Sequence, residues 1–158
     1  MTDGIVSENP LVKLRRATVG DLEELTLLQQ AAYAANREVL GVEPLPLLAD
    51  YRSVLSDYEV WIAGSGQLEG ALILDRRADH LLILSVAAAP ACQGKGMGNA
   101  LMAAAEARAK NLGLTTLRLY TGEKLTRRVG WYHRLGFVIE RVEELDDRRL
   151  VHMIKIIK

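Results

Sequence analysis

The sequence has little of several residue types that define whole classes of protein. Its 158 residues include one cysteine, Cys92, and three histidines without a ligand spacing. An internal disulfide and a multi-cysteine metal site are therefore excluded, and we expect no structural or catalytic metal. No apolar run reaches the roughly 18 residues of a membrane-spanning helix, so no membrane partner is expected.

Net charge is also lacking, because 20 basic and 20 acidic residues cancel. No overall electrostatic field then favours nucleic acid or an anionic membrane surface as a partner. The N-terminus has no basic segment followed by an apolar one, and the protein is therefore predicted to be cytoplasmic. Any anionic ligand must be held by local groups.

The chain has enough apolar residues, 49%, and the right length for one globular domain. Residues 1–10 are polar and aperiodic, which predicts a flexible tail before a single domain over residues 11–158.

Periodicity and turn residues predict a mixed α/β fold with a mostly antiparallel central sheet flanked by helices. The unbroken apolar run within residues 80–89 indicates a central strand covered on both faces. Thr18 and Asp21 match a capping box at the start of the first helix. The expected strands are 11–17, 58–63, 68–75, 80–89, 115–121, 137–142 and 150–157, and the expected helices are 19–36, 47–55, 99–112 and 125–135.

The strongest chemical signal is a run of three glycines, Gly94, Gly96 and Gly98, between the central strand and the alanine-rich helix. The first amides of a helix lack intrahelical partners and lie at the positive end of its dipole. Glycines allow close approach of the backbone, and Lys95 adds a positive side chain. A diphosphate would satisfy several of these amides together.

Other interpretations of the glycine run are a plain connecting turn or a nucleotide-binding loop. The phosphate-binding loop of nucleoside triphosphatases requires Gly-Lys-Ser/Thr, whereas Lys95 is followed by Gly96. The dinucleotide fingerprint requires a third glycine where Asn99 stands, and it opens a βαβ unit near the first strand. Both nucleotide interpretations are therefore disfavoured.

What remains is Gln-x-x-Gly-x-Gly, and here the chain resembles the GNAT superfamily of N-acetyltransferases. Gln93, Gly96 and Gly98 match the family's loop, in which backbone amides hold the diphosphate of coenzyme A. The segment Trp131-Tyr132-His133-Arg134-Leu135-Gly136-Phe137 is similar to the family's second signature, a tyrosine three residues before Leu-Gly-Phe/Tyr. The resemblance implies a GNAT-like fold, acetyl-CoA as co-substrate and transfer of its acetyl group to a primary amine.

The resemblance also implies roles for individual residues. Tyr132 would give a proton to the departing thiolate, because a tyrosine of pKa about 10 holds its proton at neutral pH. The central strand would separate from its neighbour and pair with the pantetheine amides. The implied cofactor-binding residues are Val86, Ala87, Ala88, Gln93, Gly94, Lys95, Gly96, Met97, Gly98 and Arg134, the last with Arg127 and Arg128 near the 3′-phosphate.

One feature of many relatives is missing, because no Glu or Asp lies between Leu81 and Ala89 to accept the proton of the ammonium. Glu123 is the first candidate for that role, followed by His80 and Ser85. Two alternatives to amine acetylation therefore stay open. One is a domain that binds coenzyme A without catalysis, and the other is an acyltransferase with a different acyl group or acceptor.

The acceptor is expected to be a small molecule or a peptide amine. The region from Tyr33 to Tyr51 is where the family's variable helices border the acceptor, and Trp61 and Trp131 are further candidates for that pocket. Family members are often dimers, so the resemblance is compatible with a homodimer.

Overall fold

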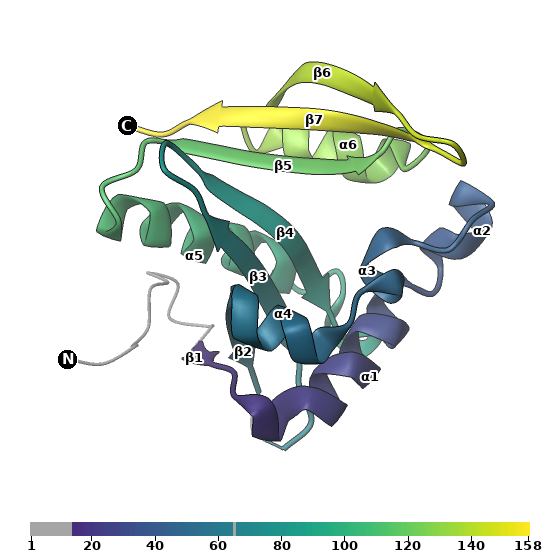
Figure 1. Cartoon of the computed structure of the whole chain (residues 1–158), viewed down its shortest axis with the longest axis vertical. Helices are drawn as coiled ribbons and strands as arrows, with labels where there is room; N and C mark the ends of the chain where they lie inside the picture. Colours follow the sequence, from purple (N-terminus) through teal and green to yellow (C-terminus); the bar gives the residue numbers. More distant parts are fainter. Residues whose placement is uncertain (1–13, 65) are drawn as a thin grey trace.

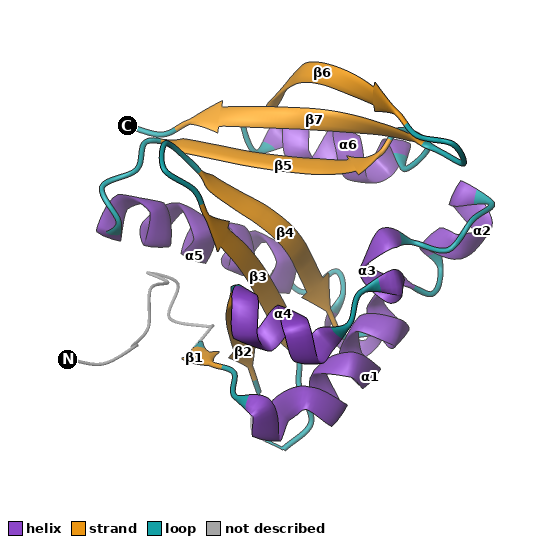
Figure 2. Ribbon diagram, in the orientation of Figure 1, coloured by secondary structure: helices purple, strands orange, loops and turns teal. Residues whose placement is uncertain are grey.

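The computed structural model describes residues 14–64 and 66–158, and shows a mixed α/β fold. Seven strands form one sheet in the order β1-β2-β3-β4-β5-β7-β6, with helices against its faces (Figure 2). All neighbouring strands are antiparallel except β4 and β5, which are parallel. The predicted fold class is therefore confirmed.

The elements follow one another in the chain as labelled in Figure 1. The strands are β1 (Arg15–Arg16), β2 (Glu59–Ala63), β3 (Gly70–Arg76), β4 (Leu81–Ala88), β5 (Thr116–Gly122), β6 (Val138–Glu144) and β7 (Arg149–Ile156). The α-helices are α1 (Leu22–Tyr33), α2 (Asn36–Leu40), α3 (Leu45–Leu48), α4 (Tyr51–Asp57), α5 (Met97–Asn111) and α6 (Thr126–Arg134). Short 3₁₀ turns at Val19–Asp21 and Pro90–Cys92 precede α1 and the glycine run.

The later elements agree with the sequence predictions, whereas the two early helices do not. The predicted helix 19–36 starts as a 3₁₀ turn and is interrupted after Tyr33, where the bond from Arg37 N to Ala34 O spans three residues. The predicted helix 47–55 is two helices, because Ala49 is extended and Asp50 starts a new helix by accepting from Arg52 N. Of the predicted strand 11–17, residues 11–13 lie outside the described residues, as does the tail 1–10.

Apolar side chains fill both faces of the sheet. On β3, Leu72 and Leu74 belong to the cluster under α5, and Ala71 and Ile73 belong to the cluster under α1 and α4. This arrangement explains why the central strands have nearly continuous apolar runs instead of alternation. Leu101 of α5 is fully buried.

Strands β4 and β5 pair only at their first residues and then separate. Their pairing runs from Leu81–Leu117 to Ile83–Leu119, although both strands continue beyond it. At the same level the register between β3 and β4 shifts, so that Leu84 is an extra residue opposite β3. A β-bulge of this kind bends its strand. Figure 1 shows β4 turning away from β5 toward α1.

The turn before α1 is fixed by Asp21, as the capping box predicted. Its carboxylate accepts from Thr18 N at 2.8 Å and from both terminal nitrogens of Arg15 at 3.0 and 2.8 Å. The hydrogen bonds from Arg15 hold the pKa of Asp21 below its usual range. The charged carboxylate therefore stabilises the folded chain.

We expect Asp21→Asn to lower the free energy of unfolding by about 1–2 kcal/mol near pH 7. A lowered pKa contributes stability above the unfolded value, and this contribution disappears as the pH falls through the folded pKa. The difference between wild type and variant should therefore shrink below about pH 4. Urea unfolding from pH 3 to 7 measures it, with exposed Asp57→Asn as the control. A pH-independent difference would contradict the role of the charge.

Candidate active site

The glycine loop lies between β4 and α5, as the sequence predicted, and two of its glycines have left-handed backbone angles. Gly94 and Gly96 have φ angles of 77° and 88°, in the left-handed region where residues with a Cβ are strained. Gly96 is the N-cap of α5, so the first amides of this helix have no partners within it. No heavy atom lies within 4 Å of the position a Cβ would take at Gly94 or Gly96. The loop is open to a ligand.

A groove of about 430 Å³ runs between this loop, the end of β4 and the end of α1. Seven of the ten residues predicted to bind the cofactor line it: Val86, Ala87, Ala88, Gln93, Gly94, Gly96 and Gly98. The other three do not. The Lys95 and Arg134 side chains are exposed, and the Met97 side chain packs toward Gly70 of β3.

Gly98 is needed for packing and not for a special backbone angle. A Cβ at Gly98 would lie 3.2 Å from the ring of Trp131, which also lines the groove. The indole of Trp131 donates to Asn99 Oδ1 at 2.7 Å. This close contact joins the first turn of α5 to α6. Gln93 holds the other side of the loop, because its amide donates to Ala88 O at 3.1 Å.

A second cavity of about 240 Å³ lies where β4 and β5 have separated. All five tyrosines of the chain line it: Tyr33, Tyr51, Tyr58, Tyr120 and Tyr132. The region from Tyr33 to Tyr51 therefore borders a cavity, and its contact with the acceptor stays a prediction. Trp61 is not part of it; its ring is buried in the core, beside the Arg108–Glu59 ion pair.

Tyr132 of α6 is buried against this cavity. Its ring lies 4.9 Å from the ring of Trp131 and 6.0 Å from that of Phe137, centroid to centroid. Burial raises the pKa of its hydroxyl, and the charge of Arg128 partly opposes this effect. The phenol therefore keeps its proton at neutral pH.

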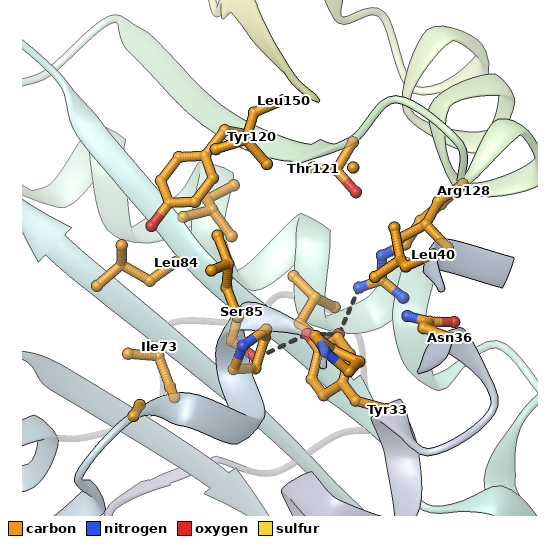
Figure 3. Close-up of a pocket in the computed structure, with 18 of the residues that line it drawn as sticks. Tyr33, Asn36, Leu40, Ile73, Leu84, Ser85, Tyr120, Thr121, Arg128 and Leu150 are labelled. Carbon is orange, nitrogen blue, oxygen red and sulfur yellow. Dashed lines mark hydrogen bonds between the residues drawn. The ribbon is translucent and has the colours of Figure 1, made fainter. Parts of the chain in front are cut away.

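Arg128 lies one helical turn before Tyr132 and points inward. Its guanidinium donates to Val86 O at 2.7 Å, and the same carbonyl accepts from the Tyr33 hydroxyl at 3.1 Å. Arg128 therefore points toward β4, and its placement near a 3′-phosphate stays a prediction. Arg128 and Tyr33 line both the groove and the cavity, so they form part of the boundary between the two (Figure 3).

A buried polar network at the base of the cavity was missed by the sequence analysis. Gln29, fully buried on α1, donates to Tyr51 Oη at 2.9 Å and to Ser85 Oγ at 3.0 Å. Ser85 is in turn 2.8 Å from the Tyr33 hydroxyl. Gln29 follows Leu25 and Leu28 on the apolar stripe of α1. A glutamine on an apolar stripe is the sequence feature that could have indicated a buried hydrogen-bonded side chain.

The predicted proton acceptors are not brought together. Ser85 lines the cavity, whereas Glu123 and His80 line neither the cavity nor the groove. The Glu123 carboxylate lies 3.7 Å from Arg149 Nε, and the His80 ring lies 2.6 Å from Asp79 Oδ1. Within residues 14–64 and 66–158, no carboxylate lines either space. The role of Glu123 stays a prediction.

The described part of the chain contains no cluster of His, Cys, Asp or Glu that could hold a metal ion. Within the same residues, no helix is both long and apolar enough to cross a membrane.

Several solved structures share this fold. The ribosomal-protein-S18-alanine N-acetyltransferase of Escherichia coli superposes with a TM-score of 0.76 at 18% identity, over 93% of this chain and 94% of its own. The PaiA N-acetyltransferase of Thermoplasma acidophilum, in complex with coenzyme A, has a TM-score of 0.73 at 20% identity, over 92% of this chain and 98% of its own. A GNAT family acetyltransferase of Elizabethkingia anophelis with acetyl-CoA bound has a TM-score of 0.70 at 16% identity, over 94% of this chain and 100% of its own.

At these identities the structures establish the fold alone, and a comparison with curated proteins finds no match. The family follows from the sequence itself. The model of the acetyltransferase (GNAT) family matches residues 25–137, which include β4, the glycine loop, α5 and α6. The chain belongs to the GNAT family of acetyltransferases.

Proposed function

We propose that this protein transfers the acetyl group of acetyl-CoA directly to a primary amine of a small molecule or a peptide. The observation that supports this most is the contact between two spaces of different chemistry. A groove beside free helix amides and left-handed glycines meets a tyrosine-lined cavity at Val86 and Arg128. A thioester lying in the groove would present its carbonyl to an amine in the cavity.

In this proposal the groove holds the cofactor. The amides after Gly96 face the diphosphate, which suits the positive end of α5. Backbone groups of Ala87 and Ala88, past the end of the β4–β5 pairing, accept the pantetheine arm as an added strand. Trp131 lines the groove beside Gly98 and Asn99.

The chemistry needs a proton at the sulfur and a proton removed from nitrogen. The amine attacks the thioester carbon, the C–S bond breaks, and Tyr132 donates its proton to the thiolate. Burial keeps this phenol protonated, which is the form that a proton donor requires. The proton released by the nitrogen leaves through solvent, and Glu123 is the candidate that takes it up outside the cavity.

A domain that binds coenzyme A without catalysis is the second candidate, because no carboxylate among the described residues lines either space. Amine-dependent release of free thiol from acetyl-CoA separates the two candidates. Thermal stabilisation by coenzyme A is expected for both.

Gly96→Ala should weaken cofactor binding about tenfold or more and destabilise the chain by about 1 kcal/mol, because alanine is strained at φ 88°. Gly113→Ala is the matched control, since Gly113 has φ 74° and equally open surroundings at the far end of α5. Both variants should lose similar stability in thermal unfolding. Calorimetric titration with coenzyme A should show weaker binding for Gly96→Ala alone; equal affinities would exclude the loop as the diphosphate site.

Tyr132→Phe should lower kcat by about 100-fold or more while changing the KM for acetyl-CoA little, because it removes a proton donor and retains the ring. Tyr120→Phe removes a hydroxyl from another tyrosine that lines the same cavity and should change kcat less than about threefold. Steady-state thiol release measures both. A kcat for Tyr132→Phe equal to that of wild type would leave Tyr132 a packing residue.

The raised pKa of Tyr132 should be visible in the pH dependence of kcat. The protonated phenol is the active form, so activity should fall on the alkaline side only as the pH passes the raised pKa, above about 10. This alkaline decline should be absent from the residual activity of Tyr132→Phe. Thermal unfolding at each pH controls for denaturation. A decline centred well below pH 9 in wild type alone would contradict the assignment.

A further inference from the structure

The charges around the tyrosine-lined cavity are of one sign. Its described lining holds two arginines, Arg128 and Arg148, and no aspartate, glutamate, histidine or lysine. A second ammonium group on an acceptor would lose its hydration here without a carboxylate to pair with, which is costly. The cavity is therefore unsuited to diamines and polyamines and suited to an acceptor that carries a negative charge.

The two arginines differ in how their charges are balanced. Arg148 is nearly buried, and its guanidinium bonds both oxygens of Asp147, at 2.9 and 3.0 Å. Arg128 has no carboxylate partner among the described residues. Its guanidinium donates to Val86 O and lies 5.4 to 5.9 Å from the ring centroids of Tyr33, Tyr132 and Trp131. A carbonyl and three aromatic faces leave its positive charge uncompensated.

The position of Arg128 fixes where a negative group of the acceptor would lie. Arg128 lines both the groove and the cavity, together with Tyr33, Asn36 and Val86. Nucleophilic attack takes place where the two spaces meet, so the reacting nitrogen lies beside these residues. A carboxylate that pairs with Arg128 is therefore close to the amine, as it is in an α-amino acid.

The rest of the cavity lining indicates what side chain such an acceptor would carry. Across the cavity from Arg128 lie Ile73, Leu84 and Tyr120 (Figure 3), and Val54 also contributes to the wall. The volume of about 240 Å³ is below the roughly 300–1,000 Å³ of pockets that take drug-sized ligands. A short apolar side chain matches this size and surface.

We propose that the acceptor is a free α-amino acid with an uncharged apolar side chain, whose carboxylate pairs with Arg128. This inference depends on the proposed acetyl transfer, since it names the amine for that reaction. The guanidinium offers further N–H donors beside the one on Val86 O, so it can hold the carboxylate and the carbonyl together. A peptide N-terminus is excluded as the preferred acceptor, because its first residue has an amide in place of the carboxylate.

The first test compares three acceptors that share one apolar side chain and differ in the group beside the amine, together with one diamine. Thiol release from acetyl-CoA is measured with leucine, leucinamide, isoamylamine and putrescine. The kcat/KM for leucine should exceed those of leucinamide and isoamylamine by about 100-fold or more, because they leave Arg128 unpaired. Putrescine should be the poorest acceptor. Equal values for leucine and isoamylamine would overturn the proposal.

The second test removes the charge. Arg128→Met should reduce the ratio of kcat/KM for leucine over isoamylamine to near one. Arg127→Met is the matched control, since Arg127 is the neighbouring residue, is exposed and lines neither space, and it should keep the wild-type ratio. An unchanged ratio in Arg128→Met, or a rise in the KM for acetyl-CoA alone, would assign Arg128 to packing or to the cofactor.

A binding measurement separates failure of this inference from failure of the proposed function. In calorimetry with wild type, N-acetylleucine should bind about tenfold or more tightly than N-acetylleucinamide, and Arg128→Met should abolish the difference. If no acceptor releases thiol but this difference is found, acetyl transfer is contradicted and the carboxylate site stands. If thiol is released and the two acetylated compounds bind equally, the transfer stands and the carboxylate site is wrong. Circular dichroism confirms that each variant is folded.

Discussion

The candidate site depends on the early end of pairing between β4 and β5. Beyond Ile83 the two strands form no further ladder, and backbone polar groups left without partners would destabilise the fold. The structure compensates at Val86, whose carbonyl accepts from Tyr33 of α1 and Arg128 of α6. Two helices from opposite ends of the chain are thereby fixed to the same point of the strand. The tyrosine-lined cavity and the groove both exist because these contacts keep β4 and β5 apart beyond Ile83.

The polar groups near this point form one connected set. Gln29 links Tyr51 to Ser85, and Ser85 contacts the hydroxyl of Tyr33, which reaches Val86. Such a network gives each hydroxyl a fixed direction in a region that also contains buried aromatic rings. The separation of β4 and β5 is therefore maintained by α1 as much as by the sheet.

The features that could be predicted from the sequence are those set by neighbouring residues. A glycine loop between a strand and a helix, a buried central strand and a tyrosine before Leu-Gly-Phe depend on local spacing, and the structure contains each of them. The inward turn of Arg128 and the bonds of Gln29 depend on where α6 and α1 lie relative to β4, which no local pattern contains. Trp61 illustrates another limit, because residue type does not distinguish a core ring from a pocket ring. Lys95 illustrates a third, since a basic residue inside a loop can be exposed to solvent without lining the groove.

The glycines of the loop respond differently to chirality. Gly94 and Gly96 have the positive φ angles that mirror-image amino acids adopt without strain, whereas Gly98 is helical and is restricted by the ring of Trp131. A D-alanine introduced by chemical synthesis would therefore suit the backbone at positions 94 and 96 and would disturb the helix at position 98, where it is an L-alanine that would press on the indole. One short motif thus combines two unrelated steric requirements. Positions 94 and 96 need a left-handed backbone, and position 98 needs a residue without a side chain beside the indole.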